Sequence, residues 1–84
     1  MAWYFVVQPS GKFARFSDVV DEFTHINLNE VEALALGRDL CGIAVASKKI
    51  EAAKNEPKRY AEVVLKMKRI HGEDEVLDIL EDIT

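Results

Sequence analysis

The spacing of apolar side chains along this chain changes after its first sixteen residues. Residues 2–16 carry aromatic and β-branched side chains on both sides of Pro9-Ser10-Gly11. Such side chains fit a pleated strand surface, and a Pro-Ser-Gly cluster is typical of a tight turn, so this stretch predicts a β-hairpin. Successive side chains of a strand point to opposite faces. The two faces of the first strand therefore carry Trp3, Phe5 and Val7, and Tyr4, Val6 and Gln8, respectively.

Beyond Phe16 the apolar positions recur at steps of three and four, which indicates helices. Ser17 is expected to cap a short helix from Asp18 to about Thr24. Asn27 and Glu30 have the spacing of a capping box for the next helix. The expected helices span residues 18–24, 28–40, 43–54, 57–71 and 73–82.

These patterns predict one α+β domain over residues 1–84, with an N-terminal two-stranded β-hairpin packed with four to five short α-helices. A chain of this length buries only about 60–65% of its extended surface on folding. A two-stranded ribbon alone is marginal in water, so the helices or a second chain must cover it.

One face of the ribbon is expected to meet the helices, which leaves the face with Tyr4 and Val6 unusually apolar for solvent. Two interpretations stay open: the helices sandwich the ribbon from both sides, or the open face docks a protein partner. A homodimer through the hairpin, with a four-stranded sheet, would remove two strand edges at once. The expected partner-binding residues are Trp3, Tyr4, Val6, Lys12 and Arg15.

Charge is segregated into blocks along the chain, although the net charge is only -4. Residues 1–16 carry +2, residues 17–43 carry -5, residues 44–71 carry +5 and residues 72–84 carry -6. The basic block would serve either as a solvated face or as a surface for phosphates or an acidic partner. Its candidate phosphate-binding residues are Lys48, Lys49, Lys58, Lys66 and Arg69.

Ala33, Gly37 and Ile43 have the spacing found in helix-turn-helix motifs, in which a second helix enters a DNA groove. Nucleic-acid binding is therefore an alternative function, and a sponge for a phosphorylated small molecule is another. Glu32 and Arg38 oppose the DNA interpretation, because they occupy positions that such motifs usually fill with apolar side chains.

Catalysis is the class with the least support. The four glycines stand singly, so there is no phosphate-binding loop, and His71 with the acids after it lacks the ligand set of a zinc site. We expect no enzyme activity, no cofactor and no metal. A single cysteine, Cys41, and a short apolar run at the N-terminus favour a cytoplasmic protein with no membrane association.

The opening Trp-Tyr-Phe-Val-Val-Gln-Pro-Ser-Gly-Lys, the Phe16-Ser17-Asp18 step and Arg69-Ile70-His71-Gly72 resemble small accessory proteins encoded by bacteriophages and prophages. The likeness is one of style over the whole chain and identifies no functional residue. It implies a small protein that binds one host protein stoichiometrically and blocks or redirects it, sometimes a defence complex.

Overall fold

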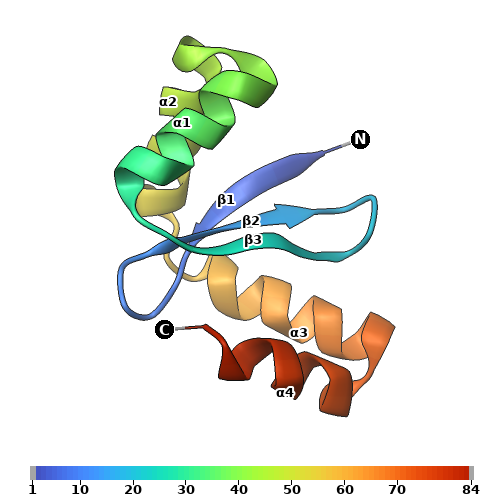
Figure 1. Ribbon diagram of the computed structural model, residues 1–84. Coiled ribbons are helices and arrows are strands. Elements are labelled where there is room, and N and C mark those ends of the chain that lie inside the picture. The colour runs from blue at the N-terminus through green and yellow to red at the C-terminus, as the bar shows by residue number, and fades with distance from the viewer. Residues whose placement is uncertain (1, 84) are drawn as a thin grey trace.

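The computed structural model describes residues 2–83 as a three-stranded antiparallel sheet followed by four helices (Figure 1). The α+β class is therefore confirmed. The sheet is a simple meander in which the central strand pairs with both neighbours. Its strands are β1 (Trp3–Val7), β2 (Phe13–Ser17) and β3 (Glu22–Leu28), and the helices are α1 (Glu30–Cys41), α2 (Ile43–Asn55), α3 (Arg59–His71) and α4 (Glu73–Glu81).

The predicted β1–β2 hairpin is present, with Trp3 opposite Ser17 at one end and Val7 opposite Phe13 at the other. Its turn closes where the Gln8 N–H donates to the Lys12 carbonyl at 2.7 Å. A third strand, β3, extends the ribbon, so the expectation of only two strands was wrong.

The helix predicted over residues 18–24 was also wrong, because residues 18–21 form a turn and Glu22–Leu28 is a strand. The Ser17 hydroxyl does accept a hydrogen bond from the Val19 N–H at 3.3 Å, but within the turn. Phe23, Thr24 and Ile26 have side chains that favour strands, and pairing with β2 satisfies the backbone of this segment. Tertiary pairing thus overrides the weak helical spacing.

The first long helix begins two residues later than the sequence predicted. Its capping box is formed by Asn29 and Glu32, whose side chains bond each other's backbone N–H groups at 2.8 and 3.0 Å. Asn27, the expected cap, lies instead in β3 with a left-handed φ of 58°. The other three helices match their predicted ranges to within two residues.

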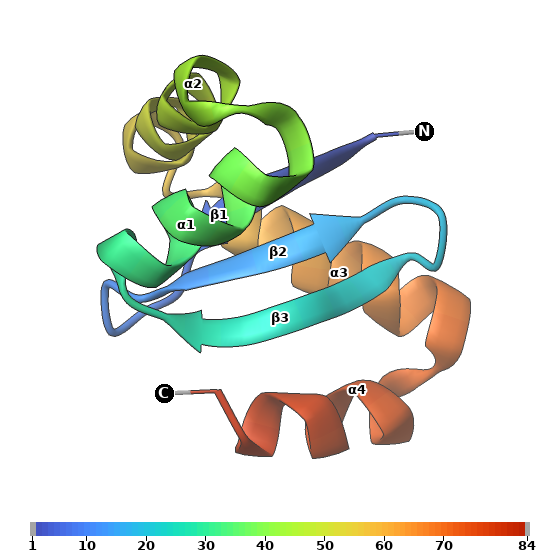
Figure 2. The same ribbon diagram turned by 45° about the horizontal axis from the view of Figure 1, so that its top comes forward.

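Two helical pairs cover the two faces of the sheet (Figure 2). On one face, Phe5 and Phe13 pack with Ala33 of α1 and Ile50 of α2. On the other face, the sheet packs with α3 and α4 around a second cluster of buried residues. That cluster comprises Val6, Ala14, Phe16, Phe23, Val63, Met67 and Val76.

Gly37, inside α1, lets α1 and α2 approach closely. A Cβ at this position would lie 2.7 Å from the Ala46 Cβ, which is shorter than contact distance. Ala33 is buried, but Ile43 is 52% exposed and fills no core position. Ala33 and Gly37 therefore pack as parts of a helical hairpin, and Ile43 does not occupy the buried position that a helix-turn-helix motif would give it.

The expected open face of the hairpin is closed. Val6 is 0% exposed, and half-buried Tyr4 packs in the same cluster beneath α3 and α4, so the sandwich interpretation holds. One hairpin edge is closed, because β3 pairs along β2, whereas β1 is an outer strand of the described sheet, with Phe5 fully buried. Because each sheet has three strands, a homodimer would not have the four-stranded sheet expected from the sequence, and association through β1 stays a prediction.

The acidic and basic blocks of the sequence lie on different elements of the fold, and ion pairs of Glu30 with Lys54 and of Asp21 with Lys66 join them. The basic block lies in α2 and α3, which pack against β1, whereas α1 packs against β2 and β3. The Asn27 side chain also links β3 to the chain beyond α4 by donating to the Asp82 carbonyl at 2.6 Å. Among the described residues, the acidic helices α1 and α4 therefore lie on the β3 side, and the basic helices α2 and α3 lie on the β1 side.

Candidate functional site

A set of aromatic rings and cations gathers around the N-terminal end of β1. Trp3 and Tyr4 are adjacent in β1 and point to opposite faces of the sheet, where cations from β2, α2 and α3 cover their rings. We call this set the cation–aromatic surface. Its residues are Trp3, Tyr4, Arg15, Lys49, Arg59 and Lys66.

On the α1–α2 face, two cations contact the indole of Trp3. The Arg15 Cζ lies 4.6 Å from the ring centroid, and the Lys49 Nζ lies 4.5 Å from it. Lys49 also donates to the Trp3 carbonyl oxygen at 3.0 Å and so occupies an acceptor on the outer edge of β1. Among residues 2–83, no carboxylate forms an ion pair with Arg15 or Lys49. The positive charge at Trp3 is therefore uncompensated.

The guanidinium of Arg15 lies along the sheet between β1 and β3. Its Nη1 donates to the Thr24 Oγ1 at 2.8 Å, while its buried Nε has no hydrogen-bond partner in the described chain. Burial lowers the pKa of Arg15, because desolvation disfavours its charged form. An unpaired and partly desolvated guanidinium gains more from an incoming anion than a fully hydrated one does.

On the α3–α4 face, Arg59 covers Tyr4 at 4.9 Å and Lys66 covers Phe16 at 5.5 Å, measured to the ring centroids. Both cations are partly compensated here: Arg59 pairs with Glu56, and the Lys66 Nζ lies 3.4 Å from Asp21 Oδ1. A shallow pocket of about 220 Å³ lies between these groups. It is lined by Tyr4, Arg59, Glu62, Val63 and Lys66.

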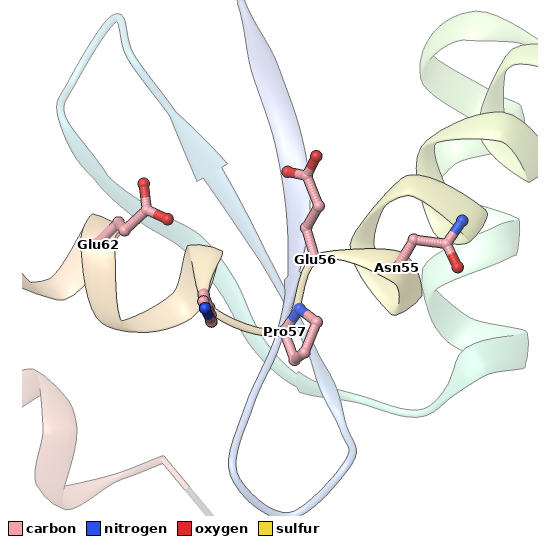
Figure 3. A pocket seen from close by; sticks show the side chains of 5 residues that line it. Asn55, Glu56, Pro57 and Glu62 are labelled. Atoms are coloured by element: carbon pink, nitrogen blue, oxygen red, sulfur yellow. The ribbon is translucent and has the colours of Figure 1, made fainter.

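A larger open hollow of about 480 Å³ lies at the connection between α2 and α3 (Figure 3). Its walls mix two carboxylates, Glu56 and Glu62, with Lys58 and the uncharged Asn55 and Pro57. The carboxylate of Glu56 is engaged by Arg59. Of the described residues, no histidine or cysteine lines the hollow.

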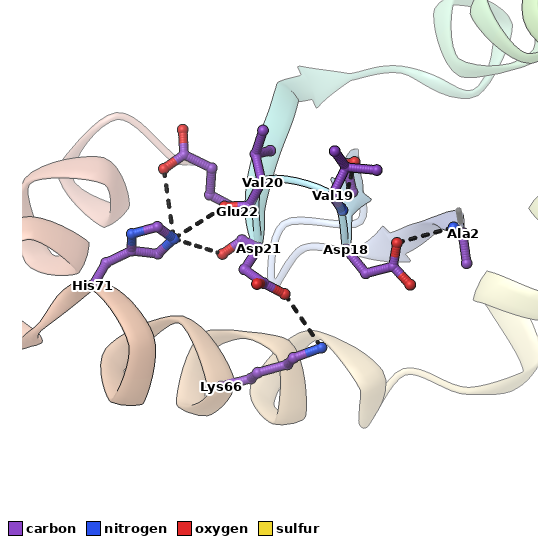
Figure 4. A network of polar contacts seen from close by, with 9 residues as sticks. Ala2, Asp18, Val19, Val20, Asp21, Glu22, Lys66 and His71 are labelled. Atoms are coloured by element: carbon purple, nitrogen blue, oxygen red, sulfur yellow. Dashed lines mark hydrogen bonds and ion pairs between the residues drawn. The ribbon is translucent and has the colours of Figure 1, made fainter.

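The turn between β2 and β3 follows Ser17, which pairs with Trp3, so it lies at the same end of the sheet as Trp3. Figure 4 shows the polar contacts of this turn. The Asp18 carboxylate accepts a hydrogen bond from the Ala2 N–H at 2.9 Å. His71, at the end of α3, contacts the turn from below through its Nε2. Sequence reasoning expected a helix here and did not detect this turn.

Ten residues were predicted to bind a partner or phosphate, and five of them take part in cation–ring contacts. Arg15 and Lys49 contact the ring of Trp3, and Lys66 contacts the ring of Phe16. Tyr4 joins them through Arg59, which the sequence-based site omitted although it lies in the basic block. Lys12 lies at the opposite end of the hairpin, and Val6 is buried. Lys48, Lys58 and Arg69 are exposed and contact none of these rings.

Within residues 2–83, no three His, Cys, Asp or Glu side chains converge as metal ligands. Over the same residues, none of the helices has the length and apolar character needed to cross a bilayer. No protein-family model, curated protein or solved structure matches this chain. The functional argument therefore starts from the cation–aromatic surface.

Proposed function

We propose that this protein is a non-enzymatic binding module that docks its cation–aromatic surface on an acidic surface of another protein, in a stoichiometric complex. The observation that carries the proposal is the Trp3 ring, which is contacted by Arg15 and Lys49 without an ion-paired carboxylate. An acidic partner would supply the missing charge.

The composition of the surface supports a protein partner. Trp, Tyr and Arg are the residue types that most often dominate the binding energy of protein interfaces. Here they lie on or against one strand whose neighbours hold them in place, so little side-chain freedom is lost on binding.

Nucleic acid is the alternative, and two features oppose it. The rings of Trp3 and Tyr4 already have cations against them, which disfavours stacking of bases on the same faces. Duplex DNA carries about one charge per 1.7 Å, and the net charge of -4, with acids on the β3 side, repels such a polyanion. A protein with a local acidic patch can contact the basic helices α2 and α3 without approaching the acidic residues on the β3 side.

The resemblance to phage accessory proteins supports a host protein as the partner. Binding of this kind would block or redirect the host protein, as a phage-type inhibitor of an enzyme or a defence complex does. Occupation of a surface is sufficient for that effect and needs no reacting group.

A matched pair of charge-removing variants tests the proposal. The tagged wild type is used to capture proteins from host cells, and the captured partner is then purified and titrated. Lys49→Gln should weaken the complex at least about tenfold, the size of an interface hot spot. Arg38→Gln removes one charge from the acidic side, where Arg38 is exposed, and should leave the affinity unchanged.

Titration with a random DNA duplex at two salt concentrations distinguishes nucleic-acid binding from binding of a protein partner. Phosphate binding weakens steeply with salt, so tight and strongly salt-dependent duplex binding that is lost in Lys49→Gln would favour nucleic acid. Equal loss of protein binding in Lys49→Gln and Arg38→Gln would reject the cation–aromatic surface as the docking site.

A further inference from the structure

The turn that joins β2 to β3 presents two valines that its backbone does not require. Val19 is 61% exposed and Val20 is 49% exposed, and neither residue has a positive φ. Turns usually place Gly, Pro, Asn, Asp or Ser at such positions, because these residues suit or stabilise the reversal. Two adjacent β-branched side chains in solvent are therefore unexplained by local structure.

The first half of the turn is held by the N-terminal end of the sheet. The Asp18 Oδ1 accepts from the Ala2 N–H at 2.9 Å, and the Asp18 N–H donates to the Ala2 carbonyl at 3.1 Å. The Ser17 hydroxyl accepts from the Val19 N–H at 3.3 Å. These bonds position the backbone on which Val19 is mounted.

The second half of the turn is held by α3 (Figure 4). The His71 Nε2 lies 3.2 Å from the Val20 carbonyl and 3.0 Å from the Asp21 carbonyl. Both oxygens are acceptors, so Nε2 carries the proton and donates. Lys66 pairs with the Asp21 carboxylate at 3.4 Å, and Asp21 itself has a left-handed φ of 53°. The turn is thus fixed before any partner arrives.

The fixed turn adjoins the cation–aromatic surface. Ser17, which precedes the turn, pairs with Trp3, and Lys66 contacts both the turn and the ring of Phe16. A partner that covers Trp3 would therefore also meet the two valines.

We propose that Val19 and Val20 form a preorganised apolar anchor that enters an apolar pocket of the acidic partner. The inference rests on the proposed function and adds an apolar contact to the charged contacts of Arg15 and Lys49. The partner's pocket is apolar where it receives the valines and bordered by carboxylates on the side that faces Arg15 and Lys49, since those cations lack acids of their own. Because the turn is already ordered, its burial costs little conformational entropy.

Photo-crosslinking in cells that express the full chain locates the partner. A photoreactive phenylalanine analogue replaces Val19, Lys48 or Val31 in separate experiments. Lys48 is exposed beside Lys49 on α2, and Val31 is 77% exposed on α1, on the acidic side. Positions 19 and 48 should give adducts with the same protein, and position 31 should give none.

Affinity for that purified protein decides the inference. The double variant Val19→Ser/Val20→Ser should bind at least about tenfold more weakly than the wild type. Val31→Ser, the matched control, should bind equally well. All three proteins should melt within about 4 °C of one another, because exposed substitutions change stability little.

The outcomes separate this inference from the proposed function. An adduct from position 48 but none from position 19, or an unchanged affinity of the double serine variant, overturns the valine anchor and leaves the cation–aromatic surface in place. An adduct from neither position overturns both.

Discussion

The side-chain amide of Gln8 forms two hydrogen bonds with Asn27, nineteen residues away in sequence. Gln8 Oε1 accepts from the Asn27 N–H at 2.7 Å, and Gln8 Nε2 donates to Asn27 Oδ1 at 2.8 Å. Gln8 is only 2% exposed, so this pair replaces water for both residues. It supports the irregular part of β3, where Asn27 adopts its left-handed conformation.

Replacement of Gln8 by leucine should therefore destabilise the fold although it adds an apolar side chain. The Asn27 N–H and Oδ1 would lose their buried partners, at a cost of about 1–3 kcal/mol in the free energy of unfolding. Urea denaturation measures this loss. Asn55→Leu, at an exposed position, should change stability by less than about 0.5 kcal/mol. Equal effects of the two variants would contradict the role of the Gln8–Asn27 pair.

Gly37→Ala should destabilise the protein, against the helix propensity of alanine. The new Cβ would meet the Ala46 Cβ at 2.7 Å and a carbon of Phe5 at 3.4 Å. Overpacking of this kind costs about 1–3 kcal/mol. The double variant Gly37→Ala/Ala46→Gly restores the space, so it should be more stable than the sum of the single changes predicts. Additive changes in thermal unfolding would exclude a steric conflict between these two positions.

Asn29→Ala should lower stability by about 1 kcal/mol, because it removes the acceptor for the Glu32 N–H at the start of α1. Asn55→Ala is a suitable control, since that side chain caps no helix start and is exposed. Denaturant titration of both variants gives the comparison. A similar loss in both would mean that the cap contributes nothing specific.

Tyr60 should make stability fall at high pH. Burial raises the pKa of Tyr60, whose ring stacks on Phe23 with a centroid separation of 6.1 Å. The folded state therefore keeps the phenol proton to a higher pH than the unfolded chain, whose tyrosine ionises near about pH 10. Stability from this group is present below that pH and is lost as pH rises through the raised pKa. The difference in unfolding free energy between Tyr60→Phe and the wild type should grow from pH 9 to 11 in favour of phenylalanine; parallel curves would contradict it.

Local patterns were sufficient where the chain's own neighbours decide the structure. The alternation of Trp3 to Gln8 identified both faces of β1, and the recurrence of apolar positions at steps of three and four located the last three helices. The basic residues of the candidate site could also be named from the sequence, although Arg59 was omitted. These features depend on side chains within a few positions of one another.

Residues 17–28 could not be predicted in the same way. Ser17, Asn27 and Glu30 carry good helix-start signals, yet the segment pairs with β2, and the pair formed by Gln8 and Asn27 holds the irregular strand. The helix and strand propensities of these residues differ by less than the free energy gained from strand pairing and burial, so contacts with distant residues decide the structure.

The sequence by itself determined that the chain forms a hairpin and helices with charges in blocks, because each depends on local composition and spacing. The tertiary structure alone decided that Val6 is buried, that Lys49 reaches Trp3 and that Val19 and Val20 are held in a fixed turn. Lys49 lies 46 positions from Trp3, and His71 lies 51 positions from Val20, and only packing of the helical pairs on the sheet brings these residues into contact.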